Sequence, residues 1–133
     1  MWNGWPLDRA VILFAGFGFS LVFIQVTMMH YRQNFRHWSQ WLPVIALPVL
    51  ALNAFFLACV NHPTLRNVFA VLAAAGVIEG LFGFYKHFTG VGKRVDGYRF
   101  HNFLVGPPII LPLLISALCA LGLLALCRPE MIP

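Results

Sequence analysis

The chain has 133 residues, of which 60% are hydrophobic and 10% are charged, and its formal net charge at pH 7 is +5. An average soluble domain carries about 25% charged residues, and a domain near this size still leaves roughly 30% of its chain surface in water. The composition therefore excludes an ordinary soluble enzyme, a disordered tail and a disulfide-linked secreted domain.

Four apolar segments are long enough to cross a bilayer as helices, because a hydrocarbon core about 30 Å thick requires about 20 apolar residues. In chain order, these segments cover residues 10–29, 41–60, 68–88 and 103–126. Between them lie two loops, 30–40 and 89–102, and a turn, 61–67, which are too short to form another domain. The sequence predicts an all-α integral membrane protein, in which residues 1–133 form one antiparallel bundle of four transmembrane helices.

The positive charges predict the orientation of these helices. Six Lys or Arg residues lie in or beside the two longer loops: Arg32, Arg36, Lys86, Lys93, Arg94 and Arg99. Only Arg9, Arg66 and Arg128 lie near the turn or the termini. Since cytoplasmic loops are enriched in Lys and Arg, we expect loops 30–40 and 89–102 in the cytoplasm and both termini outside, in a bacterial inner membrane. The same cations face anionic lipid, and no basic stripe with interleaved aromatic residues indicates nucleic-acid binding.

The two halves of the sequence resemble each other. Each half has one His followed by two prolines at the same spacing: His37, Pro43 and Pro48, then His101, Pro107 and Pro112. This match predicts a duplicated helical hairpin with a pseudo-twofold axis along the membrane normal, and chance similarity is the alternative. We expect Pro43 and Pro107 in the first turns of their helices, and Pro48 and Pro112 deeper, where they bend them.

Glu79 is the most unusual residue in the predicted spans. It lies near the middle of span 68–88, where an ionised side chain costs about 2.5–3.5 kcal/mol. Counted from the interfaces, Ser20, Asn53 and Ser116 lie at the same depth. One interpretation is a polar layer in which protonated Glu79 donates a hydrogen bond to Asn53 or to a hydroxyl. The other is a residue that relays protons or binds a quinone headgroup.

Small residues and histidines give two further patterns. Gly76 and Gly80 form a GxxxG motif, which is typical of closely packed membrane helices. His30 and His87 occupy equivalent positions at the cytoplasmic ends of the first and third spans. Two imidazoles facing across a bundle match the axial ligands of one haem b, and the alternatives are contact with a quinone or lipid headgroup or an ordinary interfacial position. No other metal site is predicted, because His37 lacks companion ligands at a suitable spacing.

Three functions are consistent with these residues. The leading hypothesis is a non-catalytic membrane subunit that anchors or stabilises a larger complex of membrane subunits in the lipid bilayer, in a respiratory, quinone-linked redox assembly. The first alternative is a membrane electron carrier that binds haem b through His30 and His87. The second alternative is a small proton-coupled transporter or channel component centred on Glu79.

Overall fold

The computed structural model describes residues 1–94 and 96–127, and every regular element in these residues is helical. The helices are α1 (Leu7–Arg32), a 3-10 turn η1 (Trp38–Gln40), α2 (Trp41–Cys59), α3 (Pro63–Arg94), α4 (Phe100–Val105) and α5 (Ile110–Cys127). Within the described residues, α1, α2 with its preceding turn, α3 and α5 are long and apolar enough to cross a membrane. In the described residues, the predicted all-helical class is therefore confirmed, as is the presence of four helices long and apolar enough to cross a membrane. Arg128 lies outside the described residues.

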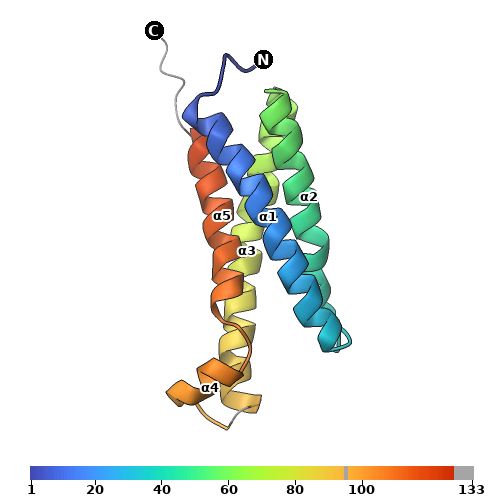
Figure 1. The fold of residues 1–133 in the computed structure, drawn as a ribbon, viewed down its shortest axis with the longest axis vertical. Helices are drawn as coiled ribbons and strands as arrows, with labels where there is room; N and C mark the ends of the chain where they lie inside the picture. Colours follow the sequence, from blue (N-terminus) through green and yellow to red (C-terminus); the bar gives the residue numbers. More distant parts are fainter. Residues whose placement is uncertain (95, 128–133) are drawn as a thin grey trace.

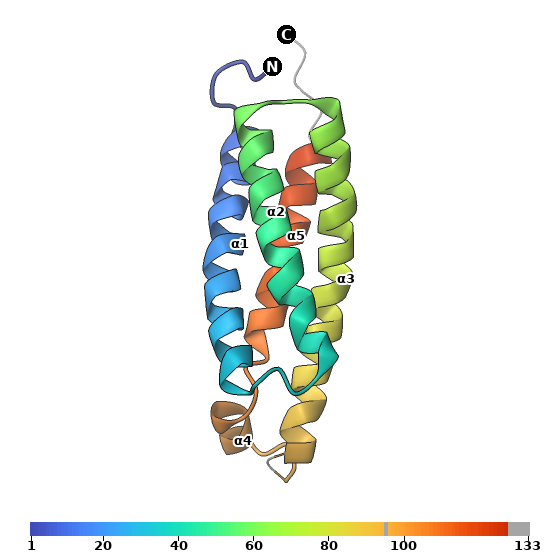
Figure 2. The ribbon, with the colours of Figure 1, turned by 90° about the vertical axis from the view of Figure 1, so that its right-hand side faces the viewer.

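The four long helices lie side by side, and the chain reverses direction between successive helices (Figure 2). α1 packs against α2 and α5, and α3 packs against the same two helices, so α1 and α3 lie diagonally opposite each other. The start of α1 and the end of α5 lie at one end of the molecule, whereas α4 and the loop after α1 lie at the other. Toward this second end, α1 and α2 diverge from α3 and α5 (Figure 1).

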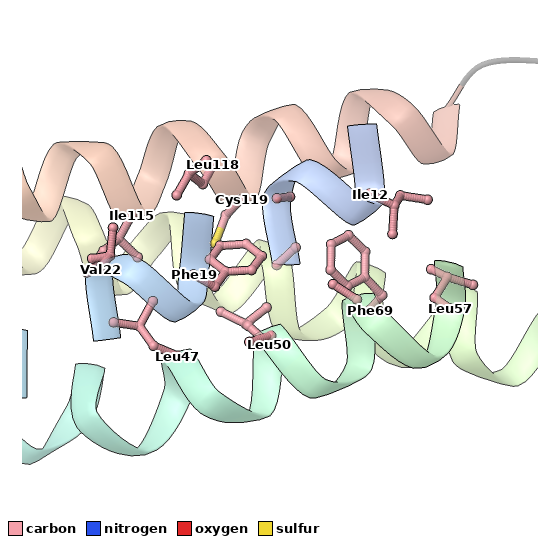
Figure 3. Packing of buried hydrophobic residues seen from close by; sticks show 14 of the residues in the cluster. Ile12, Phe19, Val22, Leu47, Leu50, Leu57, Phe69, Ile115, Leu118 and Cys119 are labelled. Atoms are coloured by element: carbon pink, nitrogen blue, oxygen red, sulfur yellow. The ribbon is translucent and has the colours of Figure 1, made fainter. Parts of the chain in front are cut away.

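A continuous apolar core fills the space between the helices (Figure 3). Each of the four long helices contributes side chains that are fully enclosed, and these include Ile12, Phe19, Leu47, Leu57, Phe69 and Cys119. Many large apolar side chains on the outer faces remain exposed, as expected for helices whose outer surface meets lipid tails. The core therefore lies along the central axis, and the outer faces of the helices also carry many large apolar side chains.

The GxxxG motif brings α3 close to α5. A Cβ atom at Gly76 would lie 2.5 Å from the Sγ atom of Cys119, and one at Gly80 would lie 2.6 Å from the carbonyl oxygen of Pro112. The hydroxyl of Ser116 donates a hydrogen bond of 2.8 Å to a backbone carbonyl of α3. Glycine at these positions therefore permits the close approach of the two backbones.

Two helices are longer than predicted. α1 extends span 10–29 by three residues at each end, and α3 begins five residues before span 68–88 and ends six residues after it. The apolar pattern identifies the part of a helix that needs lipid, but a helix continues through polar residues until a breaker stops it. The predicted turn 61–67 is therefore mostly helical, and α3 enters the expected loop 89–102.

The predicted span 103–126 is wrong at its beginning. Pro107 and Pro108 separate α4 from α5, because proline lacks a backbone N–H and disfavours the helical conformation of the preceding residue. Pro112 is the third residue of α5, so it lies in the first turn and not deeper, as expected from the sequence. Pro48 lies inside α2, in agreement with its predicted position.

The segment between α3 and α5 folds back on the end of α3. The ring of Phe88 stacks on that of Tyr98 with centroids 5.1 Å apart, and Phe103 lies 5.6 Å from Phe88. Gly92 makes room for this arrangement, because a Cβ atom there would overlap the Tyr98 ring. The second half of the expected loop 89–102 is therefore held by an aromatic cluster.

Replacing Gly80 with leucine will destabilise the protein, because the new side chain has no space between α3 and α5. Overpacking of this kind costs about 1–3 kcal/mol, so we expect a lower thermal unfolding temperature in detergent. Ala74, which is exposed on α3, provides the matched control, and Ala74→Leu is expected to unfold at the wild-type temperature. Equal unfolding temperatures for Gly80→Leu and wild type would contradict the close packing.

Candidate functional site

A cavity of about 250 Å³ lies where the two pairs of helices diverge. Side chains from all four long helices form its wall: Val26, Met29 and His30 from α1, Leu42 and Pro43 from α2, Glu79, Gly83, Lys86, His87, Lys93 and Arg94 from α3, and Leu111, Pro112 and Ile115 from α5. Residues of the loop after α1 and of the segment before α5 complete the wall at the outer end. The cavity therefore extends from the divergent end of the helices toward their middle.

His30 and His87 face each other in this cavity. Their ring centroids are 6.5 Å apart, and the ring planes are inclined by 67°. His30 is buried, with 8% of its surface exposed, and His87 is partly buried. The structure thus brings together the side chains of two histidines that lie on diagonally opposed helices.

Each ring is fixed by the same type of hydrogen bond. The Nδ1 atom of His30 donates to the carbonyl oxygen of Gln40 at 2.8 Å, and the Nδ1 atom of His87 donates to that of Pro108 at 2.6 Å. Because a carbonyl oxygen only accepts, both rings carry a proton on Nδ1, and in the neutral imidazole Nε2 keeps its lone pair. Histidines that bind a metal are typically oriented in this way.

The loop after α1 brings its carbonyl to His30 through an unusual backbone conformation. Asn34 and Phe35 both have positive φ angles, 53° and 46°, which non-glycine residues adopt only at an energetic cost. The N–H of Phe35 donates to the carbonyl of His30 at 3.1 Å, and its ring stacks on Trp41 with centroids 4.0 Å apart. The chain therefore reverses sharply, and Gln40 lies beside His30.

Two arginines make equivalent contacts at the opposite end of the molecule. The Nε atom of Arg9 donates to the carbonyl of Ala58 at 2.8 Å, near the end of α2. The Nη2 atom of Arg66 donates to the carbonyl of Leu126 at 3.3 Å, near the end of α5. Carbonyls in the last turn of a helix have no partner within the helix. Arg9 therefore caps α2, and Arg66 caps α5.

The arginine and histidine bonds repeat with the same spacing in sequence. The two arginines are 57 positions apart, as are His30 and His87, and the carbonyl acceptors are 68 positions apart in both cases. The proline match places α5 at an offset of 64 from α2, about one helical turn away from this register. With an offset of 68, buried residues of α2 correspond to buried residues of α5: Leu47, Leu50 and Leu57 to Ile115, Leu118 and Ala125. The hydrogen bonds therefore define the register of the two halves better than the prolines do.

The four polar residues predicted at one depth do not form a hydrogen-bonded layer. The hydroxyl groups of Ser20 and Ser116 donate to backbone carbonyls at 2.9 and 2.8 Å. The Oδ1 atom of Asn53 and the Oε2 atom of Glu79 are buried, and neither has a hydrogen-bond partner in the described part of the chain. The expected hydrogen bond from Glu79 to Asn53 or to a hydroxyl is therefore wrong, and Glu79 lines the cavity instead.

Charge is distributed unevenly along the cavity. Glu79 is the one acidic residue of its described wall. It lies two helical turns from His87, about 12 Å along α3 toward the middle of the molecule. Lys93 and Arg94 lie beyond His87 in the opposite direction, at the end of the helix. Lys86 lies beside His87, so cations line the cavity from the level of the histidines to its outer end, and the carboxyl group lies at its inner end.

The two histidines suit a metal that brings its own additional ligands. Among the described residues, no group of three or more His, Cys, Asp or Glu side chains is placed to hold a bare metal ion. A haem supplies four nitrogen atoms itself, so the protein needs to supply only the axial ligands. With two metal–nitrogen bonds of about 2.0 Å, opposed imidazoles have centroids roughly 6–6.5 Å apart, and the observed separation is 6.5 Å.

Comparisons with other proteins add no functional information, because no family model, curated protein or solved structure matches this chain. The site is therefore interpreted from its own residues. Sequence reasoning identified both histidines but missed Gln40 and Pro108, whose carbonyls orient them. Arg9 and Arg66 are 57 positions apart in the sequence, as are His30 and His87. This shared spacing is the sequence signal for the repeated hydrogen bonds to backbone carbonyls.

Replacing Glu79 with leucine is expected to stabilise the protein. A buried polar atom without a partner costs about 1–3 kcal/mol, and leucine removes it from a largely apolar wall. Thermal unfolding in detergent will measure a higher unfolding temperature for Glu79→Leu. Ser116→Ala, which removes a satisfied hydrogen bond, is the control and is expected to lower it slightly. A lower temperature for Glu79→Leu would mean that the carboxyl group is satisfied in solution.

Proposed function

We propose that this protein is a haem b-binding membrane subunit that transfers electrons, with His30 and His87 as axial ligands. The observation that supports this most directly is the histidine pair itself. The two rings are 6.5 Å apart, and both are held by Nδ1 hydrogen bonds to backbone carbonyls, which leaves both Nε2 atoms available for iron.

The shape and polarity of the cavity fit the same ligand. The cavity lies between two pairs of helices that diverge at this end (Figure 1), so a flat macrocycle bound there would have one histidine on each side. Apolar residues such as Leu111 and Ile115 in the wall would pack against it. Lys86, Lys93 and Arg94 line its outer part, where ammonium and guanidinium groups pair well with the two carboxylates of haem.

We also propose that the four helices form an antiparallel bundle built from a duplicated hairpin. The repeated arginine and histidine hydrogen bonds support this, because each hairpin is tied at both ends by the same kind of contact. The pseudo-twofold axis then runs along the membrane normal and passes between His30 and His87. A haem on this axis is equally accessible to both ligands.

For orientation, we propose that the cation-rich end faces the cytoplasm and that the membrane is a bacterial inner membrane. α3 has 32 residues, which corresponds to about 48 Å, whereas the hydrocarbon core is about 30 Å thick. The last turns of α3 carry Lys93 and Arg94, and the positive-inside bias places such residues on the cytoplasmic side. The outer end of the cavity then lies at the cytoplasmic interface.

A haem that exchanges single electrons requires both a donor and an acceptor, so we propose that this chain acts within a larger quinone-linked respiratory assembly. It has no catalytic role of its own in this proposal. Its outward surface supports contact with lipid and with other membrane subunits, since Phe14, Phe17 and Leu21 are each more than half exposed on α1. A lipid-soluble quinol is the class of electron donor that reaches such a subunit within the bilayer.

The haem proposal is tested by the visible spectrum of the protein, expressed with sufficient haem and purified in mild detergent. We expect one haem per chain and a low-spin spectrum typical of two histidine ligands. His30→Leu and His87→Leu are each expected to abolish this spectrum, whereas His62→Leu, at the opposite end of the molecule, retains it. A colourless wild-type protein that is fully helical would refute the proposal.

The orientation is tested by labelling single cysteines in intact cells, in a variant whose three native cysteines are replaced by alanine. We expect an impermeant thiol reagent to label Asn3→Cys directly. Ser39→Cys, in the turn before α2, is expected to react only after the cells are permeabilised. Labelling of both positions from the same side would contradict the arrangement, because a single span, α1, separates Asn3 from Ser39 and places them on opposite sides of the membrane.

A further inference from the structure

We infer that Glu79 binds a proton when the haem between His30 and His87 takes up an electron, so that this cavity couples electron transfer to proton uptake. The inference rests on the proposed function and adds a second activity to the same site. It assigns a role to the one acidic residue of the described cavity wall.

The position of Glu79 supports this role. It lies on the same face of α3 as His87, two turns closer to the middle of the helix, and both side chains line the cavity. Its Oε2 atom is buried and has no hydrogen-bond partner among the described residues. A buried carboxyl oxygen without a partner, aligned with a redox cofactor, is suited to gain or release a proton.

Packing alone does not explain a carboxyl group at this position. In the register defined by the repeated hydrogen bonds, Glu79 of α3 corresponds to Val22 of α1. Val22 is a buried core residue with 5% of its surface exposed. The fold therefore accommodates an apolar side chain at the equivalent position, and only one side of the cavity carries the carboxyl group.

The electrostatics give the direction of the coupling. An electron added to a haem in a low-dielectric site adds negative charge, and a nearby carboxylate opposes it. A proton on Glu79 removes this repulsion. A quinol, the class of donor named above, gives up one electron, which would reduce ferric to ferrous haem, and releases one proton to the water. Hydronium at the open end of the cavity supplies the proton that converts the carboxylate to the acid, so an O–H bond of hydronium breaks as the O–H bond on Glu79 forms.

The other titratable groups around the cavity lie in different places. α1 contributes His30, and α3 contributes His87 together with the lysines and the arginine of the outer end. α5 contains Cys119, a buried thiol next to Gly76 that does not line the cavity, and α2 contributes no titratable side chain to the described wall. The loop after α1 contributes His37. His101 of α4 is exposed and does not line the cavity, so it serves as the internal control.

The test is an optical redox titration of the purified haem-loaded protein at a series of pH values. For wild type, the midpoint potential is expected to fall as pH rises, with a slope that approaches 59 mV for each tenfold change in proton concentration. Glu79→Gln is expected to keep the haem spectrum and to lose most of this slope. His101→Gln is expected to retain it. Titration of the haem carboxylates contributes equally in all three proteins, so the difference between them reports on Glu79.

The outcomes separate the inference from the proposed function. A wild-type protein without a haem spectrum overturns both. A haem whose potential is independent of pH, or a wild-type slope in Glu79→Gln, overturns the inference alone, as does loss of the slope in His101→Gln. Should Glu79→Gln fail to fold, Glu79→Val is the second variant, because it copies the packing of Val22 in the other half, and the same loss of slope is expected.

Discussion

The structure depends on hydrogen bonds from side chains of one helix to backbone carbonyls at the ends of another. At one end of the molecule, Arg9 and Arg66 donate to carbonyls in the last turns of α2 and α5, which have no partner within their helix. At the other end, His30 and His87 donate to the carbonyls of Gln40 and Pro108, just before α2 and α5 begin. These contacts connect the two helices of each hairpin at both ends. At the histidine end, these hydrogen bonds also fix which ring nitrogen carries the proton. The contacts that stabilise the fold therefore also orient the two proposed ligands.

The four spans could be predicted from the sequence because hydrocarbon thickness imposes a minimum apolar length. The two histidines could be located for the same reason, because each lies at the end of an apolar segment. The end of α3 and the interruption between α4 and α5 were predicted poorly, because polar helical turns leave no apolar signal and the effect of Pro107 and Pro108 depends on the packing around them. The polar layer around Glu79 was also wrong, because equal depth in the membrane does not place side chains on facing sides of their helices.

The two halves differ in the connection between their two long helices. The turn before α2 is short and held by the left-handed residues Asn34 and Phe35, whereas the connection before α5 contains a separate helix and an aromatic cluster. Both arrangements nevertheless present a carbonyl to a histidine. Different local sequences therefore produce the same orientation of the two rings, and the difference between Val22 and Glu79 gives one half a titratable group that the other lacks.

The divergence of the two hairpins has a consequence for biogenesis. Each hairpin is connected by its own hydrogen bonds, so the first can be inserted into the membrane and completed before the second has left the ribosome. One proposed ligand lies on each hairpin, so a cofactor bound to both would hold the two hairpins together. Maturation of the protein would then depend on the supply of that cofactor, and in a chain that never receives it the two hairpins would remain apart at the histidine end.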